Sequence, residues 1–233
     1  MERIKFIVCI SLISFLSLFL SYPSLLAIPS EGNFLPGLHT TIWGFQYNHI
    51  FKRDFNKVPG QGATTQYFLK ASYGLTKRLF IDGKVGLGNV SFQRNDGLNL
   101  DFPTGFAGGY GIRYLFYADE KEKIKSIFGF QHISCHPFKD TVNNIEHRVI
   151  WDEWQGTWLF IKEFRENDIY FGPQYSNTQL KYKQGDLRRR LKSEDCWGFL
   201  LGADYQIKDD VNANAEIRFF DEWAINFGIG YKF

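Results

Sequence analysis

The sequence has one methionine, three cysteines and, beyond its first twenty residues, no long apolar run. A helix that spans a membrane needs about 20 consecutive apolar residues, so the rest of the chain is not a helical membrane protein. The net charge is only +2, and so small an excess predicts no nucleic-acid partner. The chain also has no internal repeat, low-complexity tract or linker, which indicates one domain.

The N-terminus has the parts of a secretory signal peptide. Arg3 and Lys5 precede an apolar run over 6–20, and the small residue Ala27 follows at a position suited to cleavage. The run is shorter than a spanning helix requires. We therefore expect residues 1–27 to be removed on secretion, and residues 28–37 to form a short periplasmic lead-in.

The last eleven residues, 223–233, alternate between large apolar side chains and small or polar ones. This is the period of a β-strand. A soluble sandwich would bury the large face against a second sheet, whereas a membrane barrel turns it to lipid and fills the lumen with small and polar groups. The terminal Phe233 and the spacing before it resemble the assembly signal of many bacterial outer-membrane barrels. That resemblance favours the barrel and implies the barrel assembly machinery as a partner.

Ten segments share this alternation, which predicts an all-β fold: a single antiparallel transmembrane β-barrel over 38–233, with eight strands as the alternative to ten. Short charged connections follow the even-numbered strands, as periplasmic turns do, and longer connections mostly follow the odd ones. The expected location is the outer membrane of a Gram-negative bacterium, with both termini in the periplasm. The predicted strands are 38–52, 64–75, 78–92, 105–117, 124–138, 145–164, 168–182, 196–207, 211–219 and 223–233.

The same alternation turns four charges of each sign into the predicted lumen. Balanced charges in a narrow barrel predict a network of paired side chains, and a narrow conducting pore stays the alternative. The eight residues are Lys70, Lys84, Arg113, Arg218, Asp82, Glu153, Asp204 and Glu216.

A polar cluster ends the fifth predicted strand, in the stretch 128–136. The alternation places His132 and Ser134 together on the outward face, at the level of lipid esters. Nucleophilic catalysis needs a base that takes the hydroxyl proton and a third group that orients the base. A chain reversal near Asp140 would put Ser134 opposite Glu146, which predicts Glu146 as the orienting group.

The spacing of these residues resembles a motif of known enzymes. In lipid A 3-O-deacylases and outer-membrane phospholipase A, a His-x-Ser on a barrel strand is followed twelve residues after the Ser by Glu or Asn, as in His132, Ser134 and Glu146. The resemblance implies a serine-type lipid esterase with His132 as general base, Ser134 as nucleophile and Glu146 as orienter. The stretch 132–136 also resembles the His-x-Ser-x-His of a family of outer-membrane proteins, and that resemblance names no activity.

A basic run follows the seventh predicted strand. Arg side chains can bind phosphate oxygens in pairs, so a basic extracellular loop is expected to contact lipopolysaccharide or other lipid headgroups. A non-catalytic barrel that serves envelope integrity or binding is the alternative to the esterase, and no metal site or cofactor is expected. The cations of the run are Lys181, Lys183, Arg188, Arg189, Arg190 and Lys192.

Overall fold

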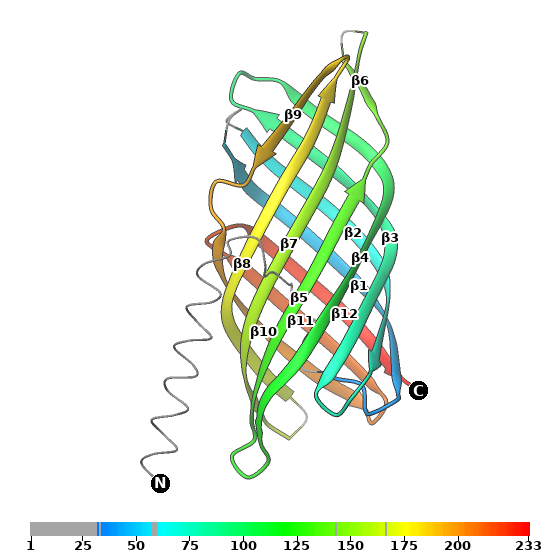
Figure 1. Cartoon of the computed structure of the whole chain (residues 1–233), viewed down its shortest axis with the longest axis vertical. Coiled ribbons are helices and arrows are strands. Elements are labelled where there is room, and N and C mark those ends of the chain that lie inside the picture. Colours follow the sequence, from blue (N-terminus) through cyan, green and yellow to red (C-terminus); the bar gives the residue numbers. More distant parts are fainter. Residues whose placement is uncertain (1–31, 33, 57–59, 143, 166) are drawn as a thin grey trace.

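The computed structural model describes Gly32 and residues 34–56, 60–142, 144–165 and 167–233. The predicted signal peptide, 1–27, lies outside these residues. Ten antiparallel strands close into one barrel (Figure 1), which confirms the predicted all-β class and strand number. They are β1 Thr41–Phe55, β2 Gly60–Gly74, β3 Leu79–Arg94, β4 Asn99–Asp119, β5 Ile124–His136, β7 Ile145–Glu163, β8 Asn167–Gln184, β10 Trp197–Lys208, β11 Val211–Phe219 and β12 Trp223–Lys232.

Two short strands, β6 Asp140–Val142 and β9 Leu187–Lys192, extend the barrel at one end, which we call the loop end. The opposite end carries the short turns and the C-terminus and is called the turn end (Figure 1). The ring closes where β12 pairs with β1 and where β7 pairs with β8. Among the described residues, no helix is long and apolar enough to cross a membrane.

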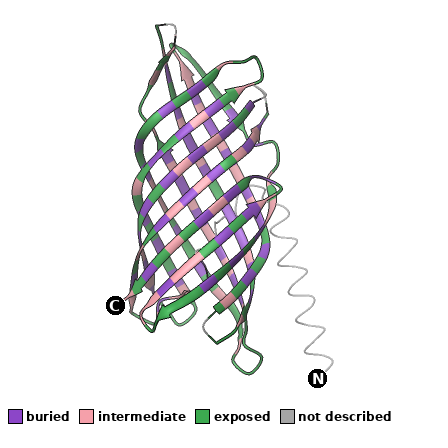
Figure 2. Cartoon of the chain, turned by 180° about the vertical axis from the view of Figure 1, so that it is seen from behind, coloured by how far each residue is buried: buried purple, intermediate pink, exposed green. Residues whose placement is uncertain are grey.

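Buried and exposed residues alternate along the strands (Figure 2). In β12, Phe227, Ile229 and Tyr231 are exposed, whereas Asn226 is completely buried. A strand points successive side chains to opposite faces, so one face of each strand lines the lumen and the other forms the outer wall. The exposed large side chains of that wall are mostly apolar or aromatic, which is the surface that a transmembrane barrel turns to lipid.

The wall is uneven because three neighbouring strands are short. β10, β11 and β12 have 12, 9 and 10 residues, whereas β4, β7 and β8 have 21, 19 and 18. Toward the loop end, β9 pairs with the outer half of β8 and meets β1 through an antiparallel bridge between Ser193 and Phe55. The backbone N–H of Asn56 also donates to the carbonyl of Lys192. At this level, therefore, β9 closes the wall that β10, β11 and β12 form nearer the turn end.

All eight predicted lumenal charges are buried. The guanidinium of Arg113 binds both oxygens of Asp82, at 2.9 and 2.8 Å. Lys84 donates to the amide oxygen of Gln46 at 2.8 Å. The predicted network of lumenal charges is therefore present.

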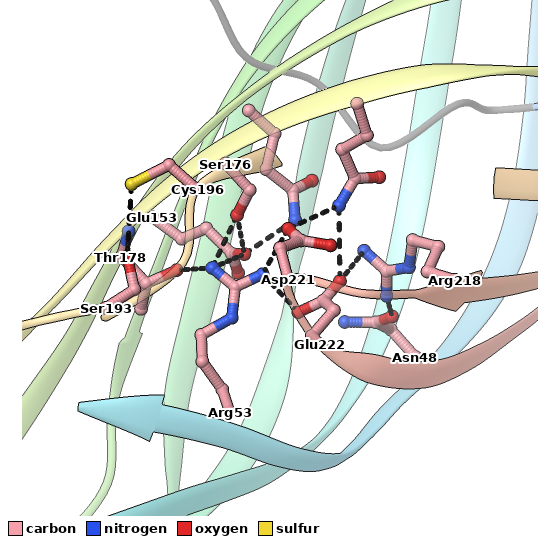
Figure 3. A network of polar contacts seen from close by, with 12 residues as sticks. Asn48, Arg53, Glu153, Ser176, Thr178, Ser193, Cys196, Arg218, Asp221 and Glu222 are labelled. Atoms are coloured by element: carbon pink, nitrogen blue, oxygen red, sulfur yellow. Dashed lines mark hydrogen bonds and ion pairs between the residues drawn. The ribbon is translucent and has the colours of Figure 1, made fainter. Parts of the chain in front are cut away.

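Three charged residues join this network without having been predicted there (Figure 3). Arg53 lies 2.5 Å from Glu222, 3.1 Å from Asp221 and 3.3 Å from Glu153. The register of β1 shifts just before Arg53, and such a bulge reverses which residues face inward. The two carboxylates come from the β11–β12 turn, where the side chains of Asp221 and Glu222 are buried and that of Phe220 is exposed.

The lumen toward the loop end is apolar. Trp151 and Phe55 are buried there in edge contact, with ring centroids 5.6 Å apart. Ile133, Leu180 and Phe102 belong to the same cluster. Apolar side chains therefore occupy a part of the lumen that the alternation alone had predicted to be small and polar.

The described part of the predicted lead-in lies inside the barrel. The carbonyl of Gly32 accepts a hydrogen bond of 3.5 Å from Arg113, and a Cβ atom at Gly32 would lie 2.2 Å from a carboxylate oxygen of Asp204. Leu35 packs against the second apolar cluster of the lumen, which includes Ile127. Gly32 and Leu35 therefore contact lumenal side chains, and the extent of the periplasmic lead-in over 28–37 stays a prediction.

Candidate functional site

The candidate site lies on the outward face of β5 and β7. Ile133 and Cys135 are buried in the lumen, while His132 and Ser134, which alternate with them, are only partly buried. Because side chains alternate along a strand, His132 and Ser134 share the outward face, as predicted. The next outward residue, His136, ends the strand and is exposed.

Two hydrogen bonds organise this face. The hydroxyl oxygen of Ser134 lies 2.8 Å from Nε2 of His136. Nε2 of His132 lies 2.6 Å from Oδ1 of Asp152, and the ammonium of Lys181 forms an ion pair with the other oxygen. The serine therefore stands between two imidazoles on one strand, and a carboxylate holds one of them.

The predicted register of Glu146 is wrong, because the residue opposite Ser134 is Asp152. β7 first pairs with β6, in a hairpin that sets Glu146 opposite Thr141, and reaches β5 only beyond that hairpin. The chain thus reverses after residue 142, later than predicted. The carboxylate across from Ser134 therefore belongs to Asp152, six residues after Glu146 on β7.

Glu146 instead belongs to an ion cluster of the β6–β7 hairpin. Its carboxylate accepts from Lys139 at 2.6 Å and from Arg148 at 2.5 Å. The hydrogen bond from Lys139 first, and then that from Arg148, holds the pKa of Glu146 below its usual value. Glu146 is therefore an ionised surface residue with two cationic partners.

Aromatic rings surround the two histidines. The ring centroid of His132 lies 4.3 Å from that of Trp154 and 5.4 Å from that of Tyr110. Phe106 lies beside His136, with centroids 6.3 Å apart. Aromatic side chains are common at the level where a membrane barrel passes from acyl chains to headgroups.

The basic run forms strands where an irregular loop was predicted. β8 and β9 make a hairpin in which Lys183 pairs with Arg188 and Lys181 pairs with Arg190. Arg189 pairs with Tyr182, which is buried, and so lies on the other face. Five of the six predicted headgroup-binding cations thus share the outward face, which we call the basic face: Lys181, Lys183, Arg188, Arg190 and Lys192.

Neither His136 nor Asp152 was given a catalytic role from the sequence. His136 only ended the stretch 128–136, and Asp152 lies on the neighbouring strand, β7. Asp152 stands between Trp151 and Glu153, which are both buried, and this alternation already assigns Asp152 to the outward face. Its pairing with β5 could not be predicted, because the register depends on the length of the β6–β7 hairpin. Among the described residues, no group of three or more His, Cys, Asp or Glu side chains is arranged to hold a metal ion.

No protein-family model and no curated protein matches the sequence. The solved structures that it resembles include the translocator domain of the autotransporter NalP from Neisseria meningitidis, with 12% identity, coverage of 86% of this chain and 90% of that one, and a TM-score of 0.47. The beta domain of the Bordetella autotransporter BrkA has 12% identity, coverage of 84% and 100%, and a TM-score of 0.49. An outer membrane channel from Pseudomonas putida has 9% identity, coverage of 88% and 100%, and a TM-score of 0.47.

Proposed function

We propose that this chain is an integral protein of the bacterial outer membrane that hydrolyses lipid esters on the outward face of its barrel. The observation that carries the proposal is the 2.8 Å contact between the hydroxyl of Ser134 and Nε2 of His136 on that face. A serine becomes a nucleophile when an adjacent base takes its proton. The apolar outer wall and the aromatic rings beside the site support a position at the outer lipid interface.

The proposed reaction is an acyl transfer to the serine followed by hydrolysis. The hydroxyl oxygen of Ser134 attacks the ester carbonyl while Nε2 of His136 takes the hydroxyl proton. The tetrahedral intermediate then expels the alcohol, which receives that proton. Water attacks the acyl-serine in the second step, its proton passes through the same imidazole, and the fatty acid leaves as the serine is restored.

His132 has a different part in this proposal from the one that its spacing predicted. Its Nε2 is engaged with Asp152, so the base that contacts the serine is His136. When it is protonated on both nitrogens, an imidazole that donates one N–H to a carboxylate can donate the other to the developing negative charge of the intermediate. We therefore assign His136 as general base, His132 as the stabilising donor and Asp152 as the residue that orients His132.

The proposal is tested with purified protein in detergent, mixed separately with lipopolysaccharide and with phospholipid, with and without calcium. Released fatty acids are followed by mass spectrometry. Ser134→Ala should lower the rate by about a thousandfold or more, while heat-modifiable migration on gels stays as in the wild type because Ser134 faces outward. A wild type that releases no fatty acid from either lipid, or a fully active Ser134→Ala, would refute the hydrolase.

A non-catalytic barrel that binds outer-membrane lipids is the second candidate, and the basic face favours it independently of Ser134. The same experiment separates the two, since this candidate releases no fatty acid. The lumen gives no support to a pore. Arg53 of β1 lies in it and donates to Ser176 and Thr178 of β8, and the apolar cluster occupies the next level toward the loop end.

A further inference from the structure

The basic face opposes like charges at successive positions. Lys183 lies opposite Arg148 on β7 and opposite Arg188 on β9, so three cations stand side by side across three strands. At the next outward position of β8, two residues nearer the turn end, Lys181 lies opposite Arg190. Like charges directly opposite each other destabilise a sheet, so this arrangement costs stability unless an anion neutralises it.

Carboxylates of the protein neutralise only part of this charge. Asp152 pairs with Lys181, and Glu146 pairs with Arg148. Within the part of the chain that the structure describes, no ion pair neutralises Lys183, Arg188 or Arg190. The face therefore retains at least three cations in one patch, two of them arginines, which bind phosphate through paired N–H groups.

The position of the patch relative to Ser134 sets the size of the ligand. Ser134 pairs with Asp152, Asp152 with Gln179, and Gln179 with Lys192, so β9 is the third strand from the serine. Lys183, Arg188 and Arg190 lie two to four residues beyond this row, toward the loop end. With about 4.8 Å between strands and about 3.3 Å per residue along a strand, their backbones lie roughly 16 to 20 Å from that of Ser134. In a glycerophospholipid, only a few bonds separate the phosphate from the esters. A phosphate on a saccharide headgroup can span the longer distance.

We infer that the basic face binds a phosphate group of a phosphorylated glycolipid and so positions one of its acyl esters at Ser134. This inference rests on the proposed hydrolase for the second half of the statement only. Lys183, Arg188 and Arg190 hold the phosphate, and the aromatic rings around His132 face the acyl region. Asp152 touches both parts, because it binds His132 on one side and Lys181 on the other.

Binding is measured in the Ser134→Ala background, so that no ligand is consumed. The probes are bisphosphorylated lipid A, the same lipid after removal of its phosphates, and phosphatidylglycerol, each titrated against protein immobilised in detergent. The test variant carries Lys183→Gln, Arg188→Gln and Arg190→Gln. Its matched control carries Lys77→Gln, Arg78→Gln and Arg165→Gln, three exposed cations at the turn end with the same total charge change.

The test variant should bind bisphosphorylated lipid A at least about tenfold more weakly than the control, because several charge-assisted hydrogen bonds are lost. The dephosphorylated lipid should bind both variants equally, and phosphatidylglycerol should distinguish them less than lipid A does. Equal binding of lipid A by both variants would overturn the inference and leave the hydrolase untouched. A larger loss for phosphatidylglycerol would overturn the assignment to a saccharide headgroup. If the wild type binds lipid A in a phosphate-dependent way but hydrolyses no ester, the phosphate-binding role of the basic face is supported and only the hydrolase is refuted.

Discussion

His132 and Asp152 lie on neighbouring strands of the barrel wall, with Nε2 of the imidazole 2.6 Å from Oδ1 of the carboxylate. The second carboxylate oxygen contacts Lys181 of the basic face. One aspartate thus connects the proposed ester site with the proposed phosphate site. Replacement of Asp152 should therefore lower the rate of ester hydrolysis through His132 and weaken lipid binding through Lys181.

Asp152→Asn should lower the turnover rate of lipid hydrolysis about ten- to a hundredfold at saturating lipid. The amide no longer stabilises a charged imidazole, but Ser134 and His136 remain in contact. Glu146→Gln is the matched control, because Glu146 is also an outward carboxylate of β7 with two cationic partners. Fatty-acid release measures both rates. If Glu146→Gln lost more activity than Asp152→Asn, the orienting role would belong to Glu146, as the sequence spacing predicted.

His136→Asn and His132→Asn should have unequal effects on hydrolysis. The asparagine at position 136 cannot take the serine proton, so we expect a loss of about a hundred- to ten-thousandfold there. At position 132 the loss should be smaller, because His136 remains to take the serine proton. Fatty-acid release at one fixed pH measures both rates. A larger loss in His132→Asn than in His136→Asn would assign the base to His132.

The two ends of the barrel should differ in their exposure on intact cells. A short tag inserted after Gly185, in the β8–β9 turn, should be labelled from outside, because this turn belongs to the loop end. A tag inserted after Glu122, in the β4–β5 turn, should be labelled only after the outer membrane is permeabilised. Labelling at Glu122 on intact cells would reverse the orientation and place the proposed ester site at the inner leaflet.

Arg53→Met should destabilise the barrel strongly. It removes the cation that contacts Glu153, Asp221 and Glu222, and breaking a buried ion network commonly costs about 3 to 5 kcal/mol. Lys52→Met is the control, since the neighbouring Lys52 is about half exposed and pairs with Asp54 at 3.2 Å. The free energy of unfolding is measured by urea titration of the protein in lipid vesicles. Equal midpoints for the two variants would show that the ion pairs of Arg53 with Asp221 and Glu222 do not stabilise the barrel.

The sequence by itself determined the strands and their faces. A period of two is a local property, so alternation alone located the ten strands, turned His132 and Ser134 outward and brought the eight lumenal charges together. The cations of 181–192 were also visible as a group. Their arrangement on one face of the sheet could not be predicted, because a basic run does not indicate the hairpin that pairs Lys183 with Arg188.

Only the tertiary structure decided how the strands align with one another. A shift of one residue turns a strand's side chains to the other face, and the bulge before Arg53 is such a shift within β1. The β6–β7 hairpin likewise shifts the register, here between β5 and β7. It carries Glu146 away from Ser134 and brings Asp152 opposite it. Pairing between strands depends on hairpin lengths and on packing across the barrel, so residues distant in sequence decide which carboxylate reaches the site.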